Sequence, residues 1–167
     1  MDARCNIYGA GVTIPPTPGG GGGGILPIQI NIAENTKLIA IASVIGEVSC
    51  CDGAPGTLNG PDGSEDGSTT LNPVGGISGI IHDYSSMFLC GVFLGPGASP
   101  NAPTSEVFSD NTDFVEIRPE IGQVFFIGDG LTGTGDGIVQ MFLVPDGATR
   151  LFFGFADAMP GAQETGH

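Results

Sequence analysis

Basic residues are scarce in this chain of 167 residues, which holds 4 lysines and arginines against 18 aspartates and glutamates. Proteins that follow the phosphates of nucleic acids need clustered lysine and arginine side chains. The four bases, Arg4, Lys37, Arg118 and Arg150, are spread along the chain, so the sequence excludes nucleic acid as a partner. The formal net charge of −14 is typical of an exported protein kept soluble by repulsion, or of one that gathers cations.

Long apolar runs are also missing. No stretch approaches the roughly 18 consecutive apolar residues that a membrane helix needs. The N-terminus MDARCNIYGAG lacks the basic start and apolar run of a signal peptide. We therefore expect no membrane insertion, and we interpret the chain as the mature form of a secreted protein that is extracellular or on the cell surface.

Charged residues make up only 13% of the chain, whereas hydrophobic residues make up 40% and glycine occurs 30 times. Low charge with abundant glycine favours a turn-rich globular fold over a disordered tail. The length is sufficient for one domain with a core and does not require two.

Apolar residues alternate along the chain with the period of β-strands. In residues 28–32, three isoleucines alternate with amides, which predicts a strand with the isoleucines on one face. Further strands are predicted within residues 38–50, 87–95, 114–118, 123–127, 138–144 and 149–155. Glycine, proline, asparagine and aspartate separate them, as in turns. The pattern predicts an all-β protein, an antiparallel β-sandwich or jelly roll of about seven to nine strands.

Signals for catalysis are weak. Gly128, Gly130 and Gly133 match the dinucleotide-binding pattern, but they lie between two predicted strands, so we interpret them as a flexible hairpin turn. The histidines, His82 and His167, are not accompanied by an activated serine or cysteine motif, and His82 is interpreted as a loop residue. We predict that the protein is not an enzyme.

Four cysteines, Cys5, Cys50, Cys51 and Cys90, form no C-x-x-C pair and therefore do not predict a zinc site. In an exported protein an even number favours disulfides, with three possible connectivities. Adjacent Cys50 and Cys51 would point to opposite faces of a strand. Cys5 either links the N-terminal segment to another subunit, or it is a buried thiol or part of a local bridge.

Residues 52–76 form a long polar connection that we interpret as lying outside the core. Its carboxylates at Asp52, Asp62, Glu65 and Asp66 are the kind of oxygen ligands that Ca²⁺ takes. Their spacing does not match an EF-hand loop, so a plain solvated loop is the alternative.

The two ends of the chain suggest that subunits complete one another. Residues 123–157 read as three strands joined by glycine turns, and the chain stops soon afterwards, so the predicted sheet lacks its closing strand. Residues 6–14, NIYGAGVTI, read as a spare strand that could cover the uncovered edge. The alternative is that the native chain continues with its own last strand.

The spare strand belongs to an N-terminal unit of residues 1–14, which a Pro/Gly hinge of residues 15–24 separates from the β-domain of residues 25–167. With period 2, one apolar face holds Tyr8, Ala10, Val12 and Ile14. Ile7 lies on the opposite face. We predict these five residues as the interface of a donated strand, in which the burial of three such side chains contributes on the order of 5 kcal/mol before entropy.

The hinge decides where this strand goes. Residues 15–24 span roughly 30 Å when extended, enough to reach a neighbour or to return to their own domain. Return gives a monomer, whereas donation gives a head-to-tail homopolymer that grows into a fibre. Because the prolines disfavour a tight reversal, we favour donation and predict a structural subunit of an extracellular fibre.

Three segments carry a resemblance to a known family: GISGIIHDYSSMFLCGVFLG, IGQVFFIGDG and above all FLVPDGATRLFFGFAD. From about Leu38 onward the chain resembles exported bacterial proteins that often carry a PEP-CTERM sorting tail. Their sandwich is similar to the LecA-like calcium-dependent galactose lectins. The resemblance implies a lectin-like sandwich and a Ca²⁺ ligand at Asp157, followed by the turn at Pro160 and Gly161.

The chain also departs from that family. Gln163 and Glu164 stand where the family has two calcium-binding asparagines, and the sugar-contacting His and Gln have no counterpart. A backbone carbonyl near Cys50 aligns with another ligand. The resemblance implies a second hypothesis, a secreted carbohydrate-binding module that uses Ca²⁺ near Asp157, without galactose specificity.

Overall fold

Strands dominate the computed structural model, which describes residues 1–2, 4–13, 24–49, 54–65, 67–108, 112–133 and 136–156. They are β1 (Ile28–Asn31), β2 (Leu38–Ile41), β3 (Val48–Ser49), β4 (Leu58–Asn59), β5 (Thr69–Leu71), β6 (Ile80–His82), β7 (Phe88–Leu94), β8 (Glu106–Val107), β9 (Glu116–Ile117), β10 (Val124–Phe126), β11 (Gln140–Leu143) and β12 (Arg150–Ala156). The described residues hold no α-helix, only the 3-10 helix η1 (Ile7–Gly9). The predicted all-β class is confirmed.

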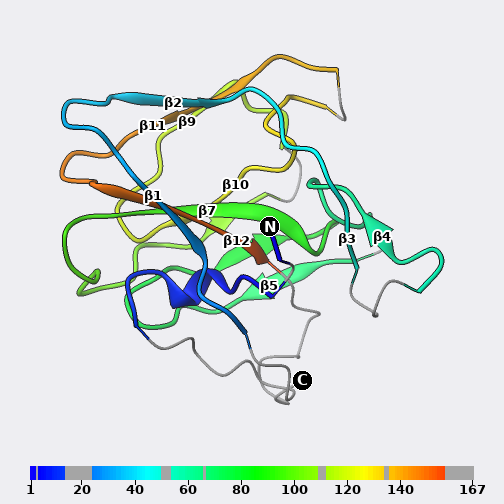
Figure 1. Cartoon of the computed structure of the whole chain (residues 1–167), viewed down its shortest axis with the longest axis horizontal. Helices are drawn as coiled ribbons and strands as arrows, with labels where there is room; N and C mark the ends of the chain where they lie inside the picture. The colour runs from blue at the N-terminus through cyan, green and yellow to red at the C-terminus, as the bar shows by residue number, and fades with distance from the viewer. Residues whose placement is uncertain are drawn as a thin grey trace.

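A central antiparallel sheet has the strand order β1-β12-β7-β10. All seven residues of β7 are buried, because its side chains alternate between two separate hydrophobic cores. A strand covered on both faces reads as a continuous apolar run, and FLCGVFL is such a run. Figure 1 shows β7 and β12 crossing the middle of the molecule.

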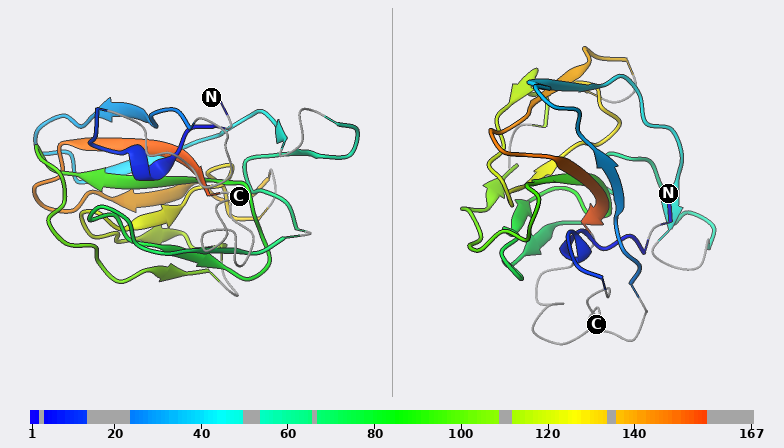
Figure 2. Two further views of the ribbon diagram at one scale, coloured as in Figure 1. Left: turned by 90° about the horizontal axis from the view of Figure 1, so that it is seen from below. Right: turned by 60° about the vertical axis from the view of Figure 1, so that its left-hand side comes forward.

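Two further sheets cover the central one. Strands β2, β11 and β9 form one, and β5, β6 and β8 form the other, while β3 and β4 make a separate pair. Figure 2 shows β2 and η1 on opposite sides of β12. The pairings β11 with β9 and β6 with β8 are parallel. The expectation of purely antiparallel pairing is therefore wrong for these two short contacts.

The core on the η1 side, called core A, includes Ile7, Ala10, Leu71, Ile77, Ile80, Phe88, Cys90, Val92, Leu94, Phe108, Val124, Phe126, Phe152 and Ala156. The core under β2, called core B, consists of Leu89, Phe93, Phe125, Ile127, Phe142, Val144 and Leu151. Phenylalanine rings pack within each core: the Phe88 and Phe126 centroids are 5.2 Å apart in core A, and those of Phe93 and Phe125 are 5.2 Å apart in core B.

Two connections differ from their prediction. The segment with Gly128 and Gly130 follows β10 and leads to β11, but β10 pairs with β7 and β11 with β2 and β9, so it is a crossing between sheets and not a hairpin. Residues 52–76, predicted as a loop outside the core, contain β4 and β5. Thr69 is buried, with its hydroxyl satisfied by donation to the Ser85 carbonyl over 2.9 Å, and buried Leu71 packs in core A.

Candidate functional site: the groove that holds the N-terminal segment

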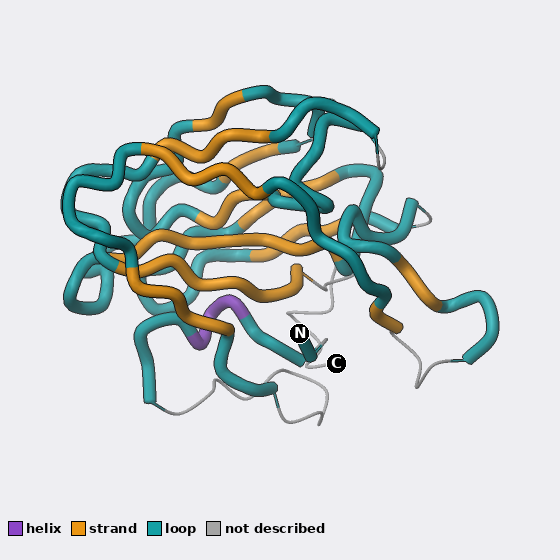
Figure 3. The backbone as a smooth tube through the Cα atoms, turned by 45° about the horizontal axis from the view of Figure 1, so that its top comes forward, coloured by secondary structure: helices purple, strands orange, loops and turns teal. Residues whose placement is uncertain are grey.

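The N-terminal segment, residues 4–13, lies on the core A face of the central sheet. Its helix η1 contacts both β12 and β7. Figure 3 shows η1 (purple) directly beside the strands of this sheet, although it is distant from them in sequence. We call the surface that it covers the N-terminal groove. The described N-terminal residues thus pack against the domain of their own chain.

Backbone hydrogen bonds insert the start of this segment into the sheet. The Phe155 N–H donates to the Cys5 carbonyl over 2.9 Å. On the other side, the Asn6 N–H donates to the Ile25 carbonyl over 3.0 Å, and the Ile25 N–H donates to the Arg4 carbonyl over 2.9 Å. Cys5 and Asn6 therefore lie as a short strand between residue 25 and the end of β12, where they satisfy backbone groups beyond the end of β1.

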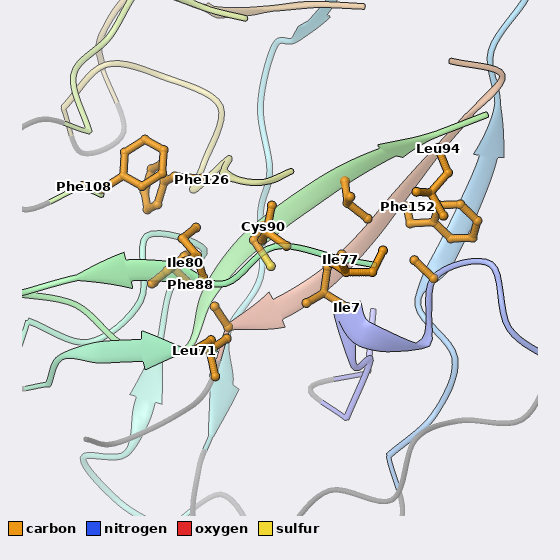
Figure 4. Packing of buried hydrophobic residues seen from close by; sticks show 14 residues of the cluster. Ile7, Leu71, Ile77, Ile80, Phe88, Cys90, Leu94, Phe108, Phe126 and Phe152 are labelled. Atoms are coloured by element: carbon orange, nitrogen blue, oxygen red, sulfur yellow. The ribbon is translucent and has the colours of Figure 1, made fainter. Parts of the chain in front are cut away.

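Side chains of Ile7 and Ala10 fill the groove. Ile7 is 1% exposed and Ala10 is 4% exposed, and both belong to core A. Figure 4 shows Ile7 reaching from η1 into this core. Full burial of one isoleucine side chain stabilises a fold by about 1.5–3 kcal/mol. Ile7 is therefore the main apolar anchor of the segment.

The predicted strand over residues 6–14 is wrong beyond Asn6, because the chain turns into η1. The Asn6 side chain caps the turn by accepting a hydrogen bond from the Tyr8 N–H over 3.0 Å. Because of this turn, Ile7 and Ala10, which the predicted strand placed on opposite faces, are both buried in core A. Val12, predicted to be buried, is 46% exposed. Ile14 lies outside the described residues.

Gly154 forms the floor of the groove. A Cβ at this position would be 2.8 Å from both the Cys5 carbonyl oxygen and the Ile7 backbone nitrogen. Only glycine leaves the segment room to lie this close to β12. Its cross-strand partner is Cys90, whose thiol donates to the Gly154 carbonyl over 3.4 Å. A glycine within the apolar run of β12 is the sequence signal that marks the position of the groove.

Tyr8 fits the groove less well than Ile7. Its ring packs against core A, but its hydroxyl is buried and has no hydrogen-bond partner within the described part of the chain. Burial raises the pKa of this hydroxyl well above its ordinary value. A buried polar group without a partner costs about 1–3 kcal/mol. This cost offsets part of the stabilisation that Ile7 provides, and it weakens the hold on the segment.

Two predicted disulfide residues lie beside the groove as free thiols. Cys5 and Cys90 are both buried, and burial raises the pKa of each thiol. For Cys5 this is the buried-thiol alternative that the sequence left open. Cys50 and Cys51 lie outside the described residues. Thiols with raised pKa values react slowly, because the thiolate is the reactive form.

Most of the predicted calcium ligands, together with the turn at Pro160 and Gly161 and with Gln163 and Glu164, lie outside the described ranges. Asp157, Asp52 and Asp66 lie outside these ranges, and within them there is no group of three or more His, Cys, Asp or Glu residues that could hold a metal ion. Asp62 accepts a hydrogen bond from the Asp129 N–H over 2.9 Å, and so ties its loop to the β10–β11 connection. Desolvation raises the pKa of Asp62.

His82, predicted as a loop residue, ends strand β6 and is buried. Its ring packs against those of Phe88 and Phe126, with centroid distances of 5.3 and 5.9 Å. Its Nδ1 accepts a hydrogen bond from the Tyr84 N–H over 3.2 Å, so the neutral ring is held in place. Burial lowers the pKa of His82, although Asp83 opposes this shift. The ring is a packing element of core A.

No family model, curated protein or solved structure matches the chain. The implied kinship with calcium-dependent lectins, and the carbohydrate-binding function that follows from it, stay predictions. Among the described residues, no helix has the length and apolar character needed to cross a bilayer.

Proposed function

We propose that the protein is a structural subunit that assembles outside the cell by exchanging its N-terminal segment between copies. Each copy donates residues 4–13 to the N-terminal groove of the next copy, so the subunits join head to tail into a fibre. In this proposal the central sheet and its covering strands act as a β-sandwich that accepts the segment. The only partner that the proposal requires is the chain itself.

The N-terminal groove carries this proposal. Ile7 and Ala10 are buried in core A, yet they belong to a segment that is joined to the rest of the domain by the Pro/Gly hinge of residues 15–24, which we call the tether. The groove recognises the segment through its own backbone groups at residues 25 and 155 and through the absence of a side chain at Gly154. A segment from a neighbouring copy presents the same groups and can make the same contacts.

In the structure the segment occupies the groove of its own chain, which is the intramolecular arrangement of the two that the sequence left open. The groove contacts are the same whether the segment binds in its own chain or in a neighbouring copy. The length of the tether and the protein concentration therefore determine which arrangement forms. The preference for donation therefore rests on the proline-rich hinge sequence and on the separable nature of the segment.

The described residues on either side of the tether lie near different parts of β7. A Cβ at Gly11 would be 3.0 Å from Leu94 Cδ1, so the segment runs toward the Leu94 end of β7. Ile25, by contrast, lies beside Cys5, near the pair of Gly154 and Cys90. Leu94 and Cys90 are separated by about 13 Å along an extended strand. Gly11 and Ile25, on either side of the tether, therefore lie near different parts of β7.

Shortening the tether tests the proposal. Deletion of Gly19–Gly23 leaves a proline-rich tether that keeps only Gly24 of its six glycines, and glycines are the residues that allow a reversal. We expect this variant to lose the closed monomer and to form longer assemblies, measured by light scattering and by negative-stain electron microscopy. A matched control inserts five glycines at the same place and is expected to shift the protein toward monomer. A short-tether variant that is folded and strictly monomeric would overturn the proposal.

Net charge sets the conditions for this experiment. Copies that each carry a formal charge of −14 repel one another, and salt screens this repulsion. We expect assembly to increase with ionic strength for both tether variants. Light scattering at low and at high salt separates this general effect from the effect of tether length.

A further inference from the structure

Strand β1 is an edge of the central sheet, and no other described strand covers its outer side. Within the described part of the chain it pairs with β12 alone, and all four of its residues are exposed. The opposite edge of the same sheet is covered, because the Val124 N–H of β10 donates to the Ser78 hydroxyl over 2.9 Å. The edge at β10 is therefore hydrogen-bonded to a neighbouring segment, whereas the edge at β1 has no such partner among the described residues.

The open edge carries apolar side chains on the core B side. Ile28 stands opposite Phe153 and Ile30 opposite Leu151, and directly opposed residues of an antiparallel pair point to the same face. Phe153 and Leu151 both pack in core B. Ile28 and Ile30 are nevertheless 45% and 41% exposed, so they extend this core to the surface without being covered.

The covering sheet is also incomplete at this side. Ile39 and Ile41 of β2 stand opposite Phe142 and Gln140 of β11, which places them on the core B face. Both are only partly buried. Leu151 on β12 and Phe142 on β11 are fully buried, as are Phe93 and Phe125 on β7 and β10, so among these strands exposed residues occur only on the outer strands β1 and β2. Core B is therefore open on the side where β1 and β2 form the edges.

Edge strands in soluble proteins are normally protected by charged residues, by proline or by a bulge. Residues 24–33, GILPIQINIA, contain no charge, and their proline precedes the strand. The β1–β12 ladder is regular over four residue pairs. The edge thus lacks the usual protection against pairing with another strand.

We infer that β1 pairs antiparallel with β1 of a second copy and forms a dimer with twofold symmetry. An antiparallel pair of identical strands satisfies a twofold axis, and Ile28 and Ile30 of each copy then cover their counterparts. A second copy fits this edge because repulsion between two chains that each carry a formal charge of −14 is weakest where charge is absent, and residues 24–33 carry none. The dimer extends the central sheet across two subunits.

Sedimentation analysis over a wide concentration range at moderate salt tests the dimer. We expect the full-length protein to dimerise, and Ile30→Lys to weaken the dimer by about tenfold or more, because it places a charge at the paired edge. Ile138→Lys is the matched control, since Ile138 is also exposed and outside the strands. It should dimerise as the parent does. Circular dichroism and thermal unfolding verify that each variant is folded.

The same experiment separates this interface from exchange of the N-terminal segment. Ile7→Asp removes the donated anchor but leaves β1 intact, so its β1 dimer should persist. Ile30→Lys leaves the groove intact, so its short-tether form should still assemble. The inference is overturned if the parent protein and Ile7→Asp are both monomeric at every concentration, or if Ile30→Lys and Ile138→Lys associate equally well. For the case that Ile30→Lys does not fold, Ile28→Lys provides the same comparison.

Discussion

The two faces of the central sheet are covered in different ways. Core A is completed by Ile7 and Ala10, which arrive from a segment far away in sequence and on a separate tether. Core B is covered by β2, β11 and β9, which are part of the continuous domain, and it stays open beside β1. The face that the tethered segment helps to cover is closed, whereas the face covered by strands of the continuous domain alone is partly open.

This difference separates two kinds of self-association. In the proposed exchange, the N-terminal segment that fills the groove of one copy fills the same groove of another copy. In the inferred dimer, β1 of a second copy adds to the sheet, because this pairing buries the surface beside β1 that the fold leaves exposed. The substitutions below change residues of core A or of the N-terminal groove. Each is compared with a reference substitution at an exposed position or in core B.

The largest expected effect comes from removing the anchor of the segment. Ile7→Ala should lower the free energy of unfolding by about 2–5 kcal/mol, because it leaves a cavity in core A. Val12→Ala is the reference, since Val12 is exposed, and its effect should stay within about 0.5 kcal/mol. Urea unfolding measures both. Equal effects would mean that the segment does not occupy the groove in solution.

Filling the floor of the groove should have the next largest effect. Gly154→Ala places a Cβ against the Cys5 carbonyl and the Ile7 nitrogen, so the segment must shift outward at a cost of about 1–3 kcal/mol. Limited proteolysis should then cleave the N-terminal segment faster. Gly97→Ala is the control, because a Cβ there has no other atom within 4 Å. An unchanged cleavage rate in Gly154→Ala would contradict this description of the groove.

The smallest effect is a dependence on pH that only core A should show. Burial lowers the pKa of His82, so the folded state binds its proton less readily than the unfolded state does. The stability that neutral His82 contributes is present above the unfolded pKa of about 6.5 and is lost as the pH falls through and below that value. The parent should therefore lose stability relative to His82→Gln between pH 7.5 and pH 5.

Core B supplies the reference for this pH effect, since none of its buried members is titratable. Phe142→Leu should lower stability by a similar amount at both pH values. Urea unfolding of the parent and the two variants at each pH gives the comparison. A stability difference between the parent and His82→Gln that does not change with pH would show that His82 is solvated in the folded state.

Much of the fold follows from the sequence pattern. The runs that became β7, β10, β11 and β12 are strongly apolar, and in β7 and β12 their burial overrides the local preference of Gly91 and Gly154. The strands at residues 69–71 and 80–82 were not predicted, because their short, mixed sequences carry no clear period. Their burial depends on partners such as Ser85, which periodicity does not reveal.

The groove was predictable only in part. The sequence indicates a separable N-terminal segment with apolar residues, and Ile7 and Ala10 are indeed buried. The sequence did not indicate the turn at Asn6, because the residues NIYGAGVTI are as compatible with the two-residue alternation of a strand as with a capped turn. The alternation of Ile28 and Ile30 correctly predicted a strand, but not its edge position, which depends on long-range pairing.

A mixing experiment tests the central claim, the exchange of the segment, most directly. Gly154→Val blocks the groove but keeps the segment, so this variant can only donate. Ile7→Asp keeps the groove but disables the segment, so this variant can only accept. To exclude pairing through β1, both variants also carry Ile30→Lys. Light scattering after size separation should find each variant alone as a monomer and the mixture as a 1:1 complex. Two monomers that persist in the mixture would contradict the claim.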